Sequence, residues 1–363
     1  MLPQIKAACC AILMASLFLS GCGSNLLSYT SNTPALVHSP IKHVGIIDQR
    51  LEFRRILCQL IARDLSGDDG TCTQWLIQFS DEAQIDDYQT SPFVFSRPTT
   101  DIMIVNGIFG ECIQNHVSIF SDATSNLINR GYKVDYVPIK GRASSKRNAE
   151  IIHEFIVSNY DVNSPRKIVI VSYSKGTADT LTALATYPDL QNKIAAILSI
   201  AGAVNGSPVA DGIQALYDSA INALPLSECE RTDKKEILSI TRSFRLNWLA
   251  ENSLPKNLLY FSIVTAPQPE RISTIFHPFY KKLAAIDPRN DGQLIYYDQV
   301  IPNSILLGYV NADHWAVAMP FEKQMPKLSK LLIDKNHYPR SQLLEASIEI
   351  IEKNLINRSN FVP

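Results

Sequence analysis

The sequence predicts an α/β fold with a mostly parallel central sheet flanked by helices. From about residue 100, short apolar runs rich in β-branched residues alternate with stretches of helical periodicity. Several of these runs are apolar throughout, which is typical of strands covered on both faces. Strands are expected at Ile102 to Val105, Tyr132 to Ile139, Ile168 to Val171, Ile194 to Ile200, Leu258 to Val264 and Ile305 to Val310.

Helical periodicity predicts the elements that connect these strands. The helices are expected at Asp48 to Asp64, Val117 to Asn129, Ser145 to Tyr160, Lys175 to Thr186 and Gln342 to Asn357. Two further helical segments between Asp211 and Leu249 make this connection longer than a plain crossover needs. Residues 205–252 are therefore predicted to form a lid over the sheet edge. Between residues 66 and 98, only a strand or two around Trp75 to Phe79 can be placed.

The N-terminus has the organisation of a secretory signal. Lys6 precedes an uncharged apolar run from Ala7 to Leu19, which is shorter than the ~20 residues that a membrane-spanning helix requires. The sequence Leu-Ser-Gly-Cys that ends at Cys22 resembles the bacterial lipoprotein box. The resemblance implies cleavage before Cys22, acylation of that cysteine and, with Gly23 next, an outer-membrane location facing the periplasm or the exterior. A standard signal peptide is the alternative.

The remaining chain is expected to be a tether and one domain. Residues 22–42 are rich in Ser, Thr, Asn and Pro, as a flexible tether would be, and residues 43–363 form the predicted domain. With 46% hydrophobic residues and a net charge of −1, the chain can bury a large core and offers no basic patch to nucleic acid.

Four cysteines remain after the lipidated one, and an exported protein is expected to pair them. They are Cys58, Cys72, Cys112 and Cys229. Four cysteines allow three pairings, and proximity in the sequence favours Cys58 with Cys72. Their irregular spacing, with no CxxC, argues against a zinc site.

A serine interrupts the chain at a predicted junction between strand and helix. The strand Ile168 to Val171 leads through Ser172 and Tyr173 to Ser174, and a helix follows. A tight turn there requires small residues two positions before and two positions after the serine. Ser172 and Gly176 meet this requirement. Ser174 is therefore a candidate nucleophile, with the Lys175 N–H at the helix N-terminus as an oxyanion donor. The alternative is an ordinary strand followed by a helix capped by serine.

A serine nucleophile needs a histidine to accept its proton. Of the histidines that follow Ser174, His314 lies just after a predicted strand, where it would reach the carboxyl edge of the sheet. His277 falls in a helical region, and a structural role is expected for it.

A carboxylate must orient that histidine, and the loop before the last strand offers three candidates. They are Asp287, Asp291 and Asp298. We choose Asp291 because it lies in an Asn-Asp-Gly turn, and turns at strand ends often carry catalytic residues. Asp313 is a weaker candidate because adjacent side chains of an extended segment point apart.

A second oxyanion donor is expected from the loop Asn106 to Gly110, which follows the strand Ile102 to Val105. Its glycines allow backbone amides to approach a substrate oxygen closely. The loop resembles the histidine-glycine oxyanion loop of lipases, with Asn106 in the place of the histidine. The resemblance implies that the N–H of Ile108, or else of Phe109, is the donor.

Taken in order, these motifs resemble the α/β-hydrolase superfamily, nearest to its lipase and esterase branch. The segment Gly206 to Asp211 is also similar to the Gly-Ser-x-x-Ala-Asp sequence that leads into the lid of bacterial lipases, whereas residues 203–205 depart from it. The resemblance covers about residues 100–320. It implies a serine hydrolase of carboxylic esters that needs no metal or cofactor. The predicted lid and membrane tether fit a lipid-like or acyl-ester substrate.

Other activities use the same three residue types. A thioesterase, phospholipase, amidase or acyltransferase would be compatible with this sequence. A non-catalytic envelope lipoprotein with this fold is the competing interpretation, because the first glycine of the usual G-x-S-x-G motif and the oxyanion histidine are both absent.

Overall fold

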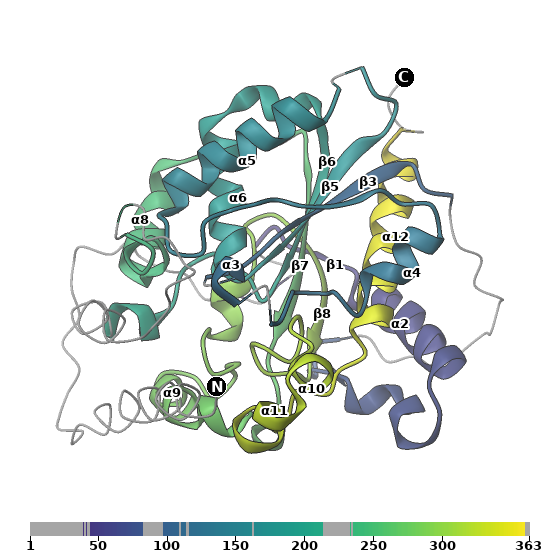
Figure 1. Cartoon of the computed structure of the whole chain (residues 1–363), viewed down its shortest axis with the longest axis vertical. Coiled ribbons are helices and arrows are strands. Elements are labelled where there is room, and N and C mark those ends of the chain that lie inside the picture. The colour runs from purple at the N-terminus through teal and green to yellow at the C-terminus, as the bar shows by residue number, and fades with distance from the viewer. Residues whose placement is uncertain are drawn as a thin grey trace.

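The computed structural model describes residues 39, 41, 44–82, 97–108, 110–113, 116–161, 163–212, 233 and 235–359 of the chain (Figure 1). The strands are β1 (Ile47–Asp48), β2 (Leu76–Ile77), β3 (Thr100–Val105), β4 (Val134–Tyr136), β5 (Lys167–Tyr173), β6 (Ile194–Ile200), β7 (Leu259–Thr265) and β8 (Ile305–Val310). The longer helices are α2 (Arg50–Asp64), α5 (Ser145–Asn159), α6 (Lys175–Thr186), α8 (Arg242–Glu251), α9 (His277–Ala284) and α12 (Arg340–Ser359). Shorter helices are α3 (Gly110–Ile113), α4 (Thr124–Asn129), α10 (Phe321–Gln324) and α11 (Pro326–Leu332).

The strands form one sheet in the order β1-β8-β7-β6-β5-β3-β4, with β2 added to β8. Every pair is parallel except β2 with β8. The register aligns Val105 at the end of β3 with Ser172 of β5, and Tyr173 with Ile200 at the end of β6. The carboxyl ends of neighbouring strands therefore meet at one edge, where ligands bind in open parallel sheets. The predicted α/β fold is confirmed.

Helices cover both faces of the sheet, as Figure 1 shows for α5, α6 and α8 on one side and α2, α4 and α12 on the other. Strand β5 illustrates why both faces are apolar. Its residues Val169 and Val171 belong to the core beneath α2, α4 and α12, whereas Ile168 and Ile170 belong to the core beneath α5 and α6. Alternate side chains of a strand point to opposite faces, so a strand buried on both faces is apolar throughout.

The N-terminal region is tied to the domain by a helix and a disulfide. Helix α2 packs on α12 and on β8. The predicted bond between Cys58 and Cys72 is present, with a Cα–Cα distance of 5.1 Å. Cys112 is disulfide-bonded as well, and Cys229 lies outside the described residues.

Two predicted elements are shorter than expected. The helix expected from Val117 begins only at Thr124, because Phe120 has a φ of 51° that a right-handed helix cannot accommodate. The Phe120 N–H instead donates to the Ala318 carbonyl at 2.8 Å. The strand expected over Tyr132 to Ile139 is limited to β4.

The predicted lid is only partly described. Helix α8 and the one-turn 3₁₀ helix Leu238–Ile240 lie in it, and residues 213–232 are outside the described residues. Among the helices that the structure describes, none is both long and apolar enough to cross a bilayer.

Candidate active site

Ser174 occupies a sharp turn between β5 and α6. Its backbone angles are φ 54° and ψ −126°, a conformation that a residue with a side chain rarely adopts. The turn is held from both sides, since the Ser174 N–H donates to the Ile200 carbonyl at 3.2 Å and its carbonyl accepts from Ala203 N–H at 3.0 Å. The strain thus exposes one hydroxyl at the carboxyl edge of the sheet, as in a nucleophile elbow.

Gly176 is required by the close approach of a neighbouring strand. A Cβ atom at this position would lie 2.2 Å from the carbonyl oxygen of Asn106 and 2.6 Å from that of Val105. Both are main-chain atoms, so no side chain can be accommodated without moving the sheet.

Ser172 replaces the usual first glycine of the motif because its hydroxyl finds partners. The side chain is fully buried, and its Oγ donates to the Leu198 carbonyl at 3.2 Å and lies 3.0 Å from Thr177 Oγ1. Thr177 Oγ1 is in turn 3.2 Å from Ser199 Oγ. A buried hydroxyl with partners avoids the desolvation penalty that would otherwise exclude it. The missing glycine therefore does not disrupt the turn.

His314 lies in the loop after β8, and its ring is next to Ser174. The Nε2 atom is 2.8 Å from Ser174 Oγ. Tyr173 holds this loop in place, because its hydroxyl donates to the His314 carbonyl at 2.6 Å. The two rings also lie against each other, with centroids 5.3 Å apart. The residue before the serine thus orients the histidine loop.

Asp291 completes the group of three. Its Oδ2 lies 2.8 Å from His314 Nδ1, and the carboxylate is fully buried. The other carboxylate oxygen accepts the N–H groups of Gln293 and Leu294 at 2.8 and 2.7 Å. These bonds fix the position of the carboxylate. Ser174, His314 and Asp291 thus form a continuous hydrogen-bonded chain.

Sequence reasoning missed two residues that support this carboxylate. Thr265, the last residue of β7, places its hydroxyl 2.5 Å from Asp291 Oδ2. The Gln299 side chain receives the Thr265 N–H at 2.7 Å and donates to the Thr265 carbonyl at 2.9 Å. The position of Thr265 at a strand end was visible in the sequence, but its partner was not.

The other candidate acids are engaged elsewhere. Asp287 pairs with Arg289 at 2.6 Å, and Asp298 pairs with Arg242 of α8 at 3.2 Å. Asp313 accepts N–H groups from Ser273 and Ala316, and burial raises the pKa of its carboxyl.

The two other histidines that follow Ser174 have structural contacts in the fold. The ring of His277 lies 3.2 Å from the Ile272 carbonyl at the start of α9. The ring of His337 packs on Trp75, with centroids 5.5 Å apart.

The two residues predicted as oxyanion donors are neighbours of residues at the turn: Lys175 follows Ser174, and Ile108 follows Gly107. Lys175 begins α6, and its side chain is buried in an ion pair with Asp179 at 2.7 Å, so only its N–H is directed to the turn. Gly107 touches the serine, since a Cβ there would lie 3.0 Å from Ser174 Cβ, and Ile108 follows it. Within the described part of the chain, the N–H groups of Ile108 and Lys175 make no hydrogen bond. Phe109, the alternative donor, lies outside it.

Burial dominates the electrostatics around these residues. It raises the pKa of the Tyr173 hydroxyl, with the charges of Asp291 and Asp313 acting in the same direction. Tyr173 therefore stays protonated and keeps its bond to the His314 carbonyl at any working pH. In the described residues, no group of three or more His, Cys, Asp or Glu side chains is arranged to hold a metal ion. Cys22, the predicted lipidation site, lies outside these residues.

Comparison with solved structures finds a carboxyl esterase that is similar to this chain. The chain is similar to the metagenomic carboxyl esterase MGS0156, with a TM-score of 0.79 and 36% identity over 89% of this chain and 97% of that chain. Two weaker likenesses are to Bacillus licheniformis lipase BlEst2 (TM-score 0.49, 17% identity, 63% of this chain and 89% of that one) and to EstA from Clostridium botulinum (TM-score 0.49, 12% identity, 83% and 98%). No protein-family model and no curated protein matches the chain.

The family assignment depends on the first of these likenesses, since the other two are too distant to carry it. The two chains are 36% identical over nearly the whole of the esterase chain. Together with the mostly parallel sheet flanked by helices, this identity indicates shared ancestry rather than a common architecture alone. The chain belongs to the carboxyl-esterase family of the α/β-hydrolase fold.

Proposed function

We propose that the protein hydrolyses carboxylic esters through an acyl-enzyme formed on Ser174. The single observation that carries this proposal is the pair of 2.8 Å contacts that His314 makes, one from Nε2 to Ser174 Oγ and one from Nδ1 to Asp291 Oδ2. A serine hydroxyl is a poor nucleophile unless a positioned base removes its proton.

The reaction follows from these contacts. Ser174 Oγ attacks the ester carbonyl carbon while its proton passes to His314 Nε2. The Asp291 carboxylate stabilises the imidazolium, and the N–H groups of Lys175 and Ile108 donate to the carbonyl oxygen as it gains charge. The intermediate collapses with release of the alcohol, which takes the proton from His314. Water then attacks the acyl-enzyme by the same steps and releases the acid.

Labelling with a fluorophosphonate probe tests this function. The folded wild-type protein should become modified at Ser174 and lose its hydrolysis of 4-nitrophenyl butyrate, whereas Ser174→Ala should take no label. Removal of the nucleophile should lower kcat by about 10³-fold or more, with little change in thermal unfolding.

Ser262→Ala is a matched control. Ser262 is also a buried serine of the sheet, but its Oγ lies 2.9 Å from Ser304 Oγ. This variant should take the label and keep its activity. Absence of label at Ser174 in the folded wild-type protein would support a non-catalytic scaffold.

We also propose that lipid on Cys22 anchors the enzyme to the outer membrane, facing the periplasm or the exterior. Support comes from the Leu-Ser-Gly-Cys box and the short apolar run before it. Radioactive palmitate should be incorporated into the wild-type protein and not into Cys22→Ala. Sedimentation of Cys22→Ala with the membrane fraction to the wild-type extent would contradict the anchor.

A further inference from the structure

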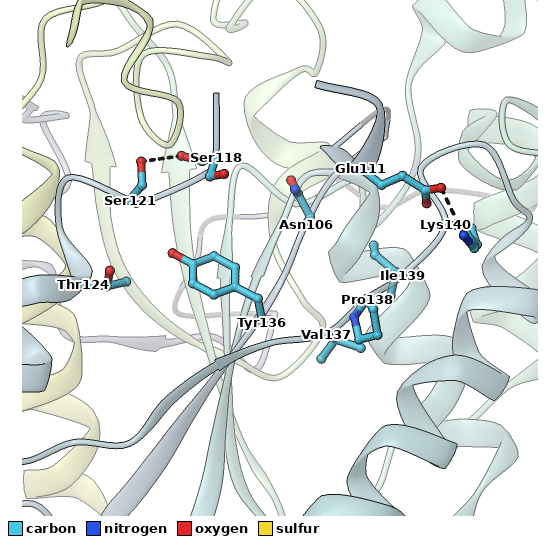
Figure 2. A pocket seen from close by; sticks show the side chains of 10 residues that line it. All are labelled: Asn106, Glu111, Ser118, Ser121, Thr124, Tyr136, Val137, Pro138, Ile139 and Lys140. Atoms are coloured by element: carbon cyan, nitrogen blue, oxygen red, sulfur yellow. Dashed lines mark hydrogen bonds and ion pairs between the residues drawn. The ribbon is translucent and has the colours of Figure 1, made fainter. Parts of the chain in front are cut away.

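A cavity of about 620 Å³ lies between the segments that follow β3 and β4 (Figure 2). Its volume is within the usual range of sites for small molecules. Polar side chains predominate among the residues that line it, which are Asn106, Glu111, Ser118, Ser121, Thr124, Tyr136, Val137, Pro138, Ile139 and Lys140. We call this cavity the polar pocket.

The polar pocket lies close to the proposed nucleophile. Asn106 lines it, and the next residue, Gly107, lies against Ser174, since a Cβ there would be 3.0 Å from Ser174 Cβ. Strand β3 lies between β4 and β5 in the parallel sheet. The segments that leave these three strands therefore share the carboxyl edge. A substrate held at Ser174 can extend one arm into the pocket.

One side of the polar pocket carries four hydroxyl groups, from Ser118, Ser121, Thr124 and Tyr136, as Figure 2 shows. The Tyr136 hydroxyl donates to the Ile119 carbonyl at 3.0 Å and is hydrogen-bonded to the Thr124 side chain. The Ser121 hydroxyl donates to the Ser118 carbonyl and accepts from Gln324 Nε2, both at 2.8 Å. A hydroxyl oxygen has a second lone pair that can still accept a hydrogen bond from a ligand. About two-fifths of the Tyr136 residue surface is exposed, so its ring is open to a ligand. This side can exchange hydrogen bonds and also offers an aromatic face.

The opposite side holds one charge of each sign. Lys140 Nζ lies 3.3 Å from Glu111 Oε1, and the other oxygen of Glu111 accepts the Gly141 N–H at 3.0 Å. The two charges offset each other, so the pocket has no net preference for an anionic or a cationic ligand.

Asn106 lies between these two sides. Its Oδ1 accepts the Gly107 N–H at 2.8 Å, which assigns the amide orientation. The Nδ2 group makes no hydrogen bond to any described residue, and is available as a donor.

Ile108, in the same loop, has apolar neighbours. The Ile108 side chain packs in a small cluster with Ala210, Ile237 and Ile240. The loop that carries the proposed oxyanion donor thus has a polar pocket at Asn106 and a buried apolar cluster at Ile108. An ester has two arms that leave its carbonyl in different directions.

We propose that the polar pocket binds the alcohol arm of the ester, and that this arm is an uncharged polyol or sugar. This inference rests on the proposed function. A hydroxyl group both donates and accepts, which matches the mixture of donors and acceptors in the pocket. A hydrocarbon arm would instead cover the Asn106 Nδ2 donor without giving it a partner, which is unfavourable.

Two esters that share a butyryl group test this assignment: propyl butyrate and 2,3-dihydroxypropyl butyrate. Their alcohols differ only by two hydroxyl groups. The wild-type enzyme should favour the dihydroxypropyl ester by about tenfold or more in kcat/KM, because a site built for hydroxyl groups discriminates against an analogue that lacks them.

Two variants locate the preference in the polar pocket. Tyr136→Phe, and separately Ser121→Ala combined with Thr124→Val, should bring the ratio of kcat/KM values toward one, mainly through KM for the dihydroxypropyl ester. Tyr187→Phe is the matched control, because this partly exposed tyrosine follows α6 and does not line the pocket. Its ratio should equal that of the wild type.

The outcomes separate this inference from the proposed function. Equal kcat/KM values for the two esters in the wild type, or an unchanged ratio in both folded pocket variants, would overturn the assignment of a hydroxylated alcohol arm. No hydrolysis of either ester or of 4-nitrophenyl butyrate would instead count against ester hydrolysis itself.

Discussion

His314 is joined to Asp291 twice. Its ring Nδ1 lies 2.8 Å from Asp291 Oδ2, and its main-chain N–H donates to the Asp291 carbonyl at 3.0 Å. The carboxylate therefore orients the ring, while the backbone bond holds the two loops together even when the ring changes its charge. Loss of the carboxylate should change the chemistry more than the fold.

Replacement of Asp291 by Asn is expected to lower kcat by about 10³ to 10⁴-fold, because an amide no longer stabilises the imidazolium and favours the wrong tautomer. Steady-state hydrolysis of 4-nitrophenyl butyrate measures this. Asp313→Asn is the control, since Asp313 is buried in the same loop as His314 but accepts backbone N–H groups. A loss of kcat in Asp313→Asn equal to that in Asp291→Asn would contradict the assigned roles.

Replacement of Ser172 by Gly is expected to keep kcat within about threefold and to lower the free energy of unfolding by about 1 to 2 kcal/mol. The variant restores the usual small residue but removes the contacts to Leu198 and Thr177. Urea unfolding and ester hydrolysis provide the two measurements. A collapse of kcat with unchanged stability would mean that Ser172 takes part in the reaction.

The raised pKa of Asp298 predicts that the stability of the fold depends on pH. Burial raises the pKa of its carboxyl from 3.8 to about 6, although Arg242 and Asn205 act in the opposite direction. Between these pH values the folded state holds a proton that the unfolded state has released, so this carboxyl makes stability fall as pH rises from about 4 to about 6. The loss is complete above that window and amounts to about 3 kcal/mol.

Asp298→Asn should remove this contribution. The difference between the free energies of unfolding at about pH 4 and about pH 7 should change by about 3 kcal/mol relative to wild type, which urea unfolding at each pH measures. Asp161→Asn, at an exposed turn, serves as the control and should follow the wild-type profile. Parallel profiles for Asp298→Asn and wild type would refute the raised pKa.

The disulfide between Cys58 and Cys72 should stabilise the N-terminal region. It joins residues separated by 14 positions, and closing a loop of this size is worth about 3 kcal/mol in the chain-entropy description. Cys58→Ser with Cys72→Ser should lower the free energy of unfolding by that amount in urea. Each single variant should match the double variant within about 0.5 kcal/mol, since neither can form the bond. An unchanged free energy of unfolding in the double variant would contradict the predicted stabilisation by the disulfide.

The placement of the proposed catalytic residues could be predicted because each has a local cause. An apolar run that ends at Ser174 and a glycine at position 176 define a tight turn, and His314 follows the last strand directly. In the sequence, only the Asn-Asp-Gly turn distinguishes Asp291 from Asp287 and Asp298, because all three precede the last strand in one segment. Their separate partners, Arg289 and Arg242, belong to different parts of the fold.

By itself, the sequence determined the alternation of strands and helices along the chain, the elbow at Ser174 and the disulfide between Cys58 and Cys72. These features depend on periodicity and on short separations in the sequence. Only the tertiary structure decided that Thr265 and Gln299 support Asp291, that Ser172 has partners in Leu198 and Thr177, and that Asn106 faces a polar pocket. These relations join residues on different elements. Their contacts form only when the parallel strands bring distant segments to the same edge.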